Sequence, residues 1–215
     1  MKQPLFGILL CAIVFGSISC SSNKDIFLAE EVKKNSTGAA FSIVALKNDW
    51  IYTNRGPNLA IDKQDLFYYS LKSSIAKTTP NTVYTYEDDL EVDNTTFSTV
   101  TVELNDKMFE INHAPDSLID ATESRYVYFL EDYAFRQVSR RENKSGYAGH
   151  EATEYNAMIF FTEFHLWDKQ LQKTVSYGSV SKEIRIGATP NDGNYVALVE
   201  MAINEILKNS PFSVY

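Results

Sequence analysis

The chain has 215 residues, with 28 acidic side chains against 20 basic ones and a formal net charge of −8 at pH 7. An acidic chain is a poor binder of nucleic acids or anionic headgroups, which attract clustered Lys and Arg. The 13 Tyr and 13 Phe argue against disorder. Roughly 175 residues after the N-terminal region are enough for one domain with a core of its own.

The N-terminus has the three parts of a bacterial export signal. Lys2 supplies a positive charge, and an apolar run follows over 5–15, too short for a bilayer core that needs about 20 residues. The next segment reads Gly16-Ser17-Ile18-Ser19-Cys20-Ser21-Ser22. It resembles the lipobox of bacterial lipoproteins, although Ser17 stands where Leu is usual. An ordinary cleaved signal peptide, with Cys20 incidental, is the alternative.

This resemblance implies a domain organisation and a place in the cell. Residues 1–19 are expected to be a signal peptide, 20–38 a lipid-anchored linker, and 39–215 a single α/β envelope domain. Cys20 would carry the lipid, palmitate among its chains, and two or three acyl chains hold a protein on a membrane almost permanently. Because Ser21 rather than Asp follows, the resemblance implies an outer-membrane lipoprotein facing the periplasm. The mature domain would have no disulfide, since Cys11 leaves with the signal.

The first half of the domain alternates apolar runs with polar breaks. Residues 25–38 are charged and favour a linker or a frayed helix. Asp62 is a good N-cap for a helix whose apolar side chains recur at helical spacing. We expect the remaining elements to be a buried strand over 39–46, a strand over 82–86 and a β-hairpin over 100–111.

The second half is richer in strands. The segment 126–138 predicts an apolar strand, 139–154 a long connection and 156–167 a central strand, because its start is apolar on both faces. The side chains of 175–186 change parity, which predicts a β-bulge at Gly178. Thr189-Pro190 begins a last amphipathic helix with Asn191, Asp192 and Asn194 as candidate caps.

This order of elements predicts an α+β fold, with a mixed, largely antiparallel sheet and two amphipathic helices packed on one face. The segment from Met158 to Phe212 resembles small bacterial envelope lipoproteins of uncharacterised function. Their domains are similar to the periplasmic α/β modules of peptidoglycan-synthase activators and of the N-terminal part of the Tol-system propeller protein. The resemblance implies the fold more strongly than the function.

Candidate chemistry is sparse. The histidines are His113, His150 and His165. His150, Glu151 and Glu154 lie close in sequence, but without the His-Glu-x-x-His spacing, so we expect a solvated loop and no metal or cofactor site. His165 alternates with Glu163 and predicts the polar surface of a strand. No Gly-x-Ser-x-Gly turn is present for a serine hydrolase.

Two further groups of side chains are candidate binding surfaces. The basic cluster Arg136, Arg140, Arg141 and Lys144 is interrupted by Glu142 and is expected to be a solvated loop. Surface Tyr and Trp side chains favour protein interfaces or sugar stacking; the candidates are Trp50, Tyr52, Tyr68, Tyr69, Tyr84, Tyr86 and Trp167. The favoured alternative is that the Tyr side chains fill the edges of the sheet core, and Trp167 is expected to pack under the hairpin turn.

The sequence therefore favours a non-enzymatic, lipid-anchored periplasmic scaffold, assembly or accessory factor that acts on an envelope protein partner. A surface-exposed lipoprotein that binds a glycan or a peptide is the alternative. A hydrolase with an unrecognised site is the third hypothesis.

Overall fold

The computed structural model describes residues 21–32, 40–45, 64–78, 84–86, 97–142 and 153–212. Its main feature is a six-stranded sheet in the order β1-β8-β7-β6-β2-β3. The strands are β1 Ser21–Leu28, β2 Phe41–Ala45, β3 Tyr84–Tyr86, β6 Tyr126–Glu142, β7 Thr153–Asp168 and β8 Lys173–Ile186.

The sheet is mixed and largely antiparallel, as predicted. The pairs β1–β8, β8–β7 and β7–β6 are antiparallel, whereas β2 lies parallel to both β6 and β3. The β7 strand lies inside the sheet and buries side chains on both faces toward its C-terminal end. This position matches the expectation from its doubly apolar sequence.

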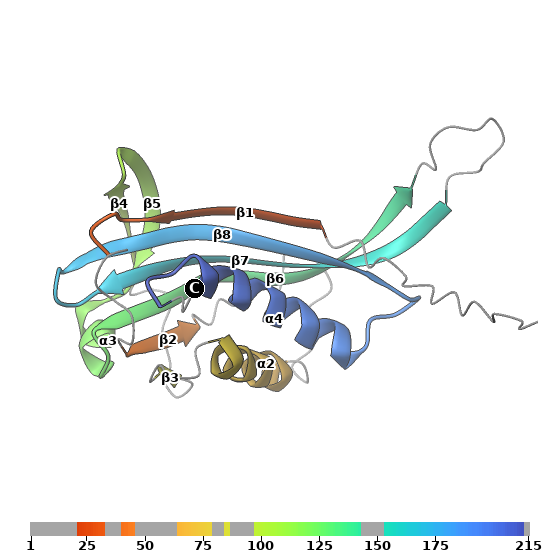
Figure 1. The fold of residues 1–215 in the computed structure, drawn as a ribbon, viewed down its shortest axis with the longest axis horizontal. Helices are drawn as coiled ribbons and strands as arrows, with labels where there is room; N and C mark the ends of the chain where they lie inside the picture. Colours follow the sequence, from red (N-terminus) through yellow and green to blue (C-terminus); the bar gives the residue numbers. More distant parts are fainter. Residues whose placement is uncertain are drawn as a thin grey trace, which may run out of the picture.

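Two helices, α2 Gln64–Thr78 and α4 Asp192–Lys208, pack on one face of the sheet, again as predicted (Figure 1). The Phe67 ring of α2 stacks on Tyr133 of β6 with centroids 4.5 Å apart. The side chains that α4 buries lie on one stripe: Leu198, Val199, Ala202, Ile203, Ile206 and Leu207. They meet the β7 side chains Met158, Phe160, Phe164 and Leu166 in the main core.

The start of α4 shows why the sequence places a helix there. Asn191 and Asn194 form a capping box, in which each side chain accepts a hydrogen bond from the other's backbone N–H. These bonds satisfy donors that the first turn leaves open. Pro190 immediately precedes this cap, and Ser210-Pro211 follows the helix. The expected helix and its boundaries are thus confirmed.

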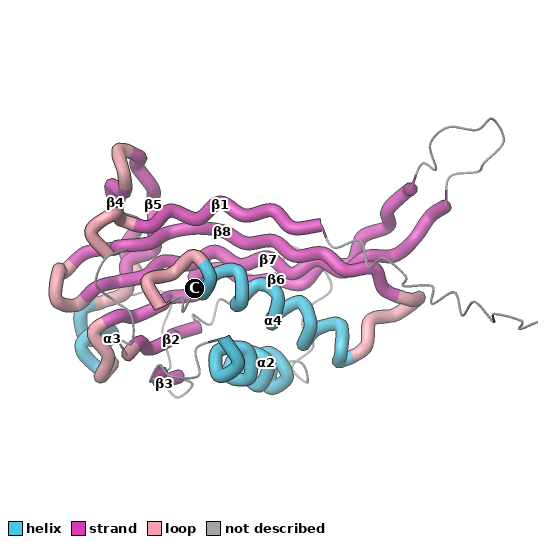
Figure 2. Tube along the Cα trace, in the orientation of Figure 1, coloured by secondary structure: helices cyan, strands magenta, loops and turns pink. Residues whose placement is uncertain are grey.

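A β-hairpin covers one end of the opposite sheet face. It consists of β4 Ser98–Leu104 and β5 Lys107–His113, joined by Asn105 and Asp106, which both have positive φ as a tight two-residue turn requires. Figure 2 shows it rising from the sheet at the end away from the start of α4. The short helix α3 Asp116–Ala121 follows, and its buried side chains join a second core that includes Val127 and Phe129.

The expected linker after Cys20 is wrong over its first part, because Ser21–Leu28 is the edge strand β1. Its polar composition concealed a strand whose three apolar residues, Ile26, Phe27 and Leu28, all pack against the main core. The expected connection over 139–154 is also too long. The β6 strand continues to Glu142 and β7 begins at Thr153, so only 143–152 lie between them.

The side chains of β8 do change faces along the strand, as predicted, but the bulge that causes the change is not at Gly178. The register of β7 and β8 shifts between Leu166 and Trp167, which places the extra β8 residue at Val175. Gly178 pairs regularly and lies under β1, where an added Cβ would be 2.5 Å from the Asp25 carbonyl oxygen. Its missing side chain therefore permits the close approach of β1.

Among the described helices, none is long and apolar enough to cross a bilayer. The predicted N-cap Asp62 and the export signal lie outside the described residues.

Candidate functional site

The most unusual buried group lies between the sheet and the hairpin. His165 of β7 and Glu131 of β6 are 0% and 5% exposed, and the His165 Nδ1 atom contacts the Glu131 carboxylate. Burial of two such groups is costly unless they are paired and hydrogen-bonded. We therefore take this pair as the first candidate site.

A β-bulge positions Glu131. Leu130 pairs with Phe164, and Asp132 pairs with Glu163, so Glu131 is the extra residue of β6. Bulges redirect a side chain and are common beside functional sites. The prediction that His165 lies on a polar sheet surface is wrong, because the hairpin covers this part of the face. The signal that sequence reasoning missed is Glu131 itself, which directly follows four apolar residues.

The hairpin contributes directly to this pair. The second Glu131 oxygen accepts a hydrogen bond from the Asn112 backbone N–H at 2.9 Å. The His165 ring stacks on Phe129 with centroids 4.8 Å apart. Its Nε2 atom, like the Trp167 Nε1 atom, is buried without a hydrogen-bond partner among the described residues. The carboxylate thus links two strands of the sheet to β5.

Two neighbouring groups respond to this environment. Burial, and then the charge of His165, lower the pKa of His113, whose ring lies 4.8 Å from the Trp167 ring. Burial, and then the negative charges of Glu163 and Glu131, raise the pKa of Tyr177 to about 12. Both groups therefore favour their neutral forms near neutral pH.

A carboxylate that orients an imidazole is a common part of general-base catalysis. Here both groups are closed off by packing, and a general base must come within hydrogen-bond reach of its substrate. The described residues contain no group of three His, Cys, Asp or Glu side chains that could hold a metal ion. The arrangement is suited to locking the hairpin onto the sheet.

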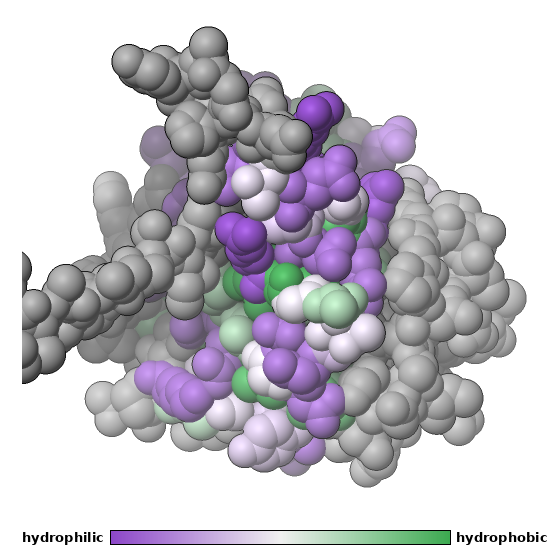
Figure 3. All heavy atoms as spheres, turned by 90° about the vertical axis from the view of Figure 1, so that its right-hand side faces the viewer, coloured by the Kyte–Doolittle hydropathy of each residue, from purple (hydrophilic) through white to green (hydrophobic). Residues whose placement is uncertain are grey.

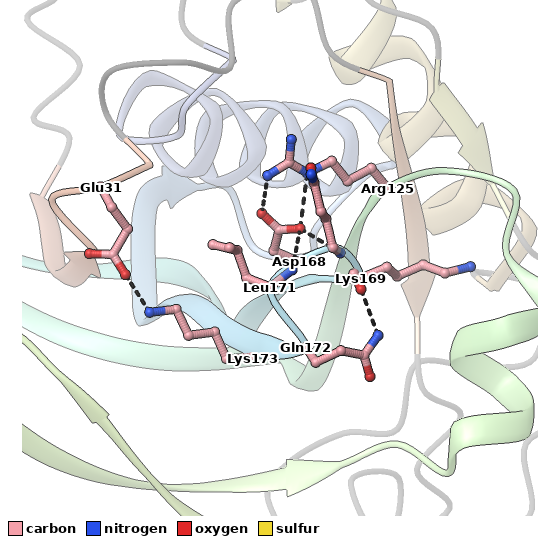
Figure 4. Close-up of polar contacts among 8 residues, drawn as sticks. Glu31, Arg125, Asp168, Lys169, Leu171, Gln172 and Lys173 are labelled. Atoms are coloured by element: carbon pink, nitrogen blue, oxygen red, sulfur yellow. Dashed lines mark hydrogen bonds and ion pairs between the residues drawn. The ribbon is translucent and has the colours of Figure 1, made fainter.

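A second polar cluster fixes the β7–β8 turn at the same end. The Asp168 carboxylate is fully buried and accepts two hydrogen bonds from the Arg125 guanidinium, at 2.7 and 2.9 Å. The backbone N–H groups of Gln170 and Leu171 donate to it as well. Burial alone would raise the pKa of Asp168, but these donors outweigh it and lower the pKa. Figure 4 shows Asp168 between Arg125 and the turn, with the Lys173–Glu31 pair beside it.

A third cluster holds β1 against the rest of the molecule. Glu205 of α4 accepts hydrogen bonds from Lys24 of β1 and from Lys182 of β8. Lys182 is only 5% exposed, so its ion pair with Glu205 compensates for the burial of its ammonium group. The hydrogen bond from Lys24, the largest effect, and that from Lys182 lower the pKa of Glu205 to about 2.

Several predicted site residues lie outside the described residues: Cys20, His150, Glu151, Lys144, Trp50 and Tyr52. Of the group His150, Glu151 and Glu154, the structure describes Glu154, which is exposed near the start of β7. Of the aromatic candidates, Tyr69 is 66% exposed and Trp167 is half-buried under the hairpin end. For Tyr84 and Tyr86 only the backbone is described.

The predicted loop containing the basic cluster is wrong, because Arg136, Arg140 and Arg141 lie on β6. Arg140 forms a two-pronged ion pair with Glu183 of β8, and Arg185 lies 3.9 Å from Glu142. Figure 3 looks onto this end of the molecule, where the described surface is mostly hydrophilic with small hydrophobic areas between charged groups.

No family model matches the chain, and no curated protein matches it. Several solved structures show a distant likeness, among them the following three. A PelC dodecamer from Paraburkholderia phytofirmans is 14% identical, with a TM-score of 0.38 over 91% of this chain and 99% of that one. A neuraminyllactose-binding hemagglutinin homologue from Helicobacter pylori is 11% identical, with a TM-score of 0.35 over 80% and 83%. A PDZ domain protein from Parabacteroides distasonis is 4% identical, with a TM-score of 0.35 over 92% and 38%. Likeness at this level carries no conclusion about function or assembly.

Proposed function

We propose that this chain is a bacterial lipoprotein, anchored through Cys20, that acts without catalysis as a scaffold or accessory factor for another envelope protein. The observation that carries the proposal is the segment Gly16–Ser22, in which small residues precede Cys20 after a short apolar run. Cys20 is also the only cysteine beyond Cys11, so lipid is a better explanation for it than an internal disulfide.

The folded part supports a binding role more than a catalytic one. Three of its buried ionisable side chains, His165, Glu131 and Asp168, are paired with one another or with Arg125 and hold structural elements together. Catalytic groups would have to reach a substrate in a cleft. A partner protein is the ligand class that an acidic domain with sparse candidate chemistry suits best.

Replacement of Cys20 by Ser tests the anchor. The wild-type protein should incorporate radiolabelled palmitate and fractionate with membranes, whereas Cys20→Ser should do neither. Cys11→Ser, which changes the signal but not the expected lipid site, is the matched control and should behave as wild type. A Cys20→Ser protein that still carries palmitate and stays in the membrane fraction would contradict the proposal.

In vivo cross-linking tests the partner. The anchored protein should return the same envelope protein in repeated pull-downs, and the Cys20→Ser protein should return less of it. Repeated recovery of no envelope protein counts against the scaffold role. Protease treatment of intact cells should leave the domain intact if it faces the periplasm, and digestion would favour the surface-exposed alternative.

A further inference from the structure

The strand β1 begins at Ser21, the residue directly after Cys20, and Ser21 already pairs with Glu183 of β8. Consecutive Cα atoms are about 3.8 Å apart, so a lipid on Cys20 would sit next to the sheet with no flexible tether between them. The start of β1 would then be held at the membrane surface. The orientation of the whole domain then depends on the strands and side chains that surround the start of β1.

The row of paired residues at this point runs straight across the sheet. Ser21 pairs with Glu183, Glu183 with Ile159, and Ile159 with Arg136. Beyond the row, β6 continues to Glu142 and β7 starts at Thr153. Six further residues of a strand span about 20 Å. We call the residues 137–142 and 153–158 the arm; Figure 1 shows it running on past the start of β1.

The arm restricts how the domain can stand on a membrane. A sheet standing upright on the lipid at Cys20 would push the arm about 20 Å into the bilayer, where the open edges of strands and the Arg charges are unfavourable. The strands must therefore lie along the membrane surface. The helices α2 and α4 hold one sheet face away from it, and the hairpin covers the opposite face only at the far end.

At the anchored end, no described helix or hairpin covers this face, and its side chains have the chemistry of a membrane interface. The strand register places Arg136, Val138 and Arg140 of β6 on it, opposite Ile159, Ala157 and Tyr155 of β7. Arg185 of β8 joins them and lies over the Tyr155 ring at 4.6 Å. Arginine binds phosphates, and tyrosine favours the headgroup region.

The charges on this face favour the same orientation. Three arginines, Arg136, Arg140 and Arg185, face two glutamates, Glu142 and Glu183, whereas the whole chain carries −8. Arg136 is exposed and forms no ion pair with a described residue. An anionic membrane would attract this face and repel the acidic remainder of the domain.

We propose that the face carrying Arg136, Arg140 and Tyr155 lies against the lipid phosphates of the membrane that holds Cys20, an inference that rests on the lipid anchor proposed above. The contact places the arm against the membrane, and the hairpin, which projects from the same face at the other end, tilts that end of the sheet away from the lipid (Figure 2). An anchored domain with a long tether would have no fixed orientation.

The experiment uses the lipidated protein in vesicles of phosphatidylethanolamine and phosphatidylglycerol. A single environment-sensitive fluorophore is attached to Thr153→Cys, on the proposed face of the arm, or to Ser139→Cys, on its other face. Lipidated Cys20 cannot react with the label. We expect the water-soluble reductant dithionite to destroy the label at position 153 several-fold more slowly than that at position 139.

Charge reversal tests the phosphate contact. Arg136→Glu should shift the equilibrium away from the docked state by about fivefold for each unit of charge and expose the label at position 153. Arg141→Glu is the matched control, because Arg141 is exposed on the other face of the same strand. It should leave the label protected.

The outcomes separate this proposal from the anchor. Equal reduction at positions 153 and 139, in protein that floats with the vesicles, overturns the docking and leaves the anchor in place. Protection at position 153 that appears only after a membrane-protein extract is added also overturns it and assigns the face to a protein partner. A Cys20→Ser protein that floats as well as wild type overturns both.

Discussion

The two ends of the sheet differ in how their charged side chains are placed. At the hairpin end, β4, β5 and α3 cover the face opposite the helices, and charged groups such as Glu131 and Asp168 are buried with matched partners. At the arm end, none of the described elements covers the same face, and its charges form exposed pairs such as Arg140–Glu183. Buried pairs make a structure depend on each member, whereas exposed pairs contribute little. The hairpin end is therefore expected to be rigid, whereas the arm end has a surface that can contact another molecule.

Replacement of Glu131 by Ala tests this contrast most strongly. The change leaves His165 buried without its carboxylate and removes the acceptor of the Asn112 N–H, so we expect a loss of about 3 kcal/mol in the free energy of unfolding. Glu142→Ala at the arm end is the control and should cost about 0.5 kcal/mol or less. Urea unfolding of the soluble domain measures both. Equal losses would remove the distinction between the two ends.

Replacement of Asp168 by Ala should have the next largest effect. It removes the acceptor of both Arg125 hydrogen bonds and of two backbone N–H groups in the β7–β8 turn. Because Arg125 is partly exposed and regains water, we expect a loss of about 2 kcal/mol in the free energy of unfolding. Thermal unfolding should show it. A variant as stable as wild type would mean that the turn is held by other contacts.

Replacement of Gly178 by Ala should loosen β1, the strand that begins directly after the expected anchor. The new Cβ would lie 2.5 Å from the Asp25 carbonyl oxygen and 2.9 Å from the Ile26 Cα. Relief of this overlap should cost about 2 kcal/mol in the free energy of unfolding. Gly187→Ala, where nothing lies within 4 Å of an added Cβ, is the matched control. If both substitutions have the same effect, β1 does not approach β8 as closely as described.

Acid should weaken the attachment of β1 by a smaller amount. The folded pKa of Glu205, about 2, lies below its ordinary value of 4.5. Its contribution is therefore complete above pH 4.5 and is lost as the pH falls toward 2. The pKa values of Asp168 and His113 are also lower in the folded protein, so protonation of these groups reduces the free energy of unfolding as well. For His113 this loss begins as the pH falls below about 6.5.

The Glu205→Gln variant isolates the contribution of Glu205 to this acid sensitivity. It should flatten the fall in unfolding free energy between pH 4.5 and 2, as measured by urea titrations at each pH. An unchanged slope would show that Lys24 and Lys182 gain nothing from this carboxylate.

Periodicity in the sequence was enough to predict the elements that bury one regular apolar stripe. The apolar face of β7 that meets the helices and the cap and stripe of α4 follow from local spacing and are confirmed. The strand β1 did not follow, because its polar residues are satisfied by distant partners such as Glu205. The burial of His165 depends on a hairpin that is distant in sequence, and only the tertiary structure brings Glu131 to it. The bulge at Val175 was likewise predicted only in part. The alternation of apolar side chains indicated a shift in register, but its position depends on the pairing with β7.

Hydrogen exchange of the lipidated protein in vesicles is the most direct test of an anchor without a tether. The account predicts that the backbone amides of β1 that donate to β8 are protected to a degree comparable with the amides of β8, from the first paired residues after Cys20. Exchange of all β1 amides within seconds, while β7 and β8 remain protected, would show a free segment between the lipid and the domain and would contradict the account.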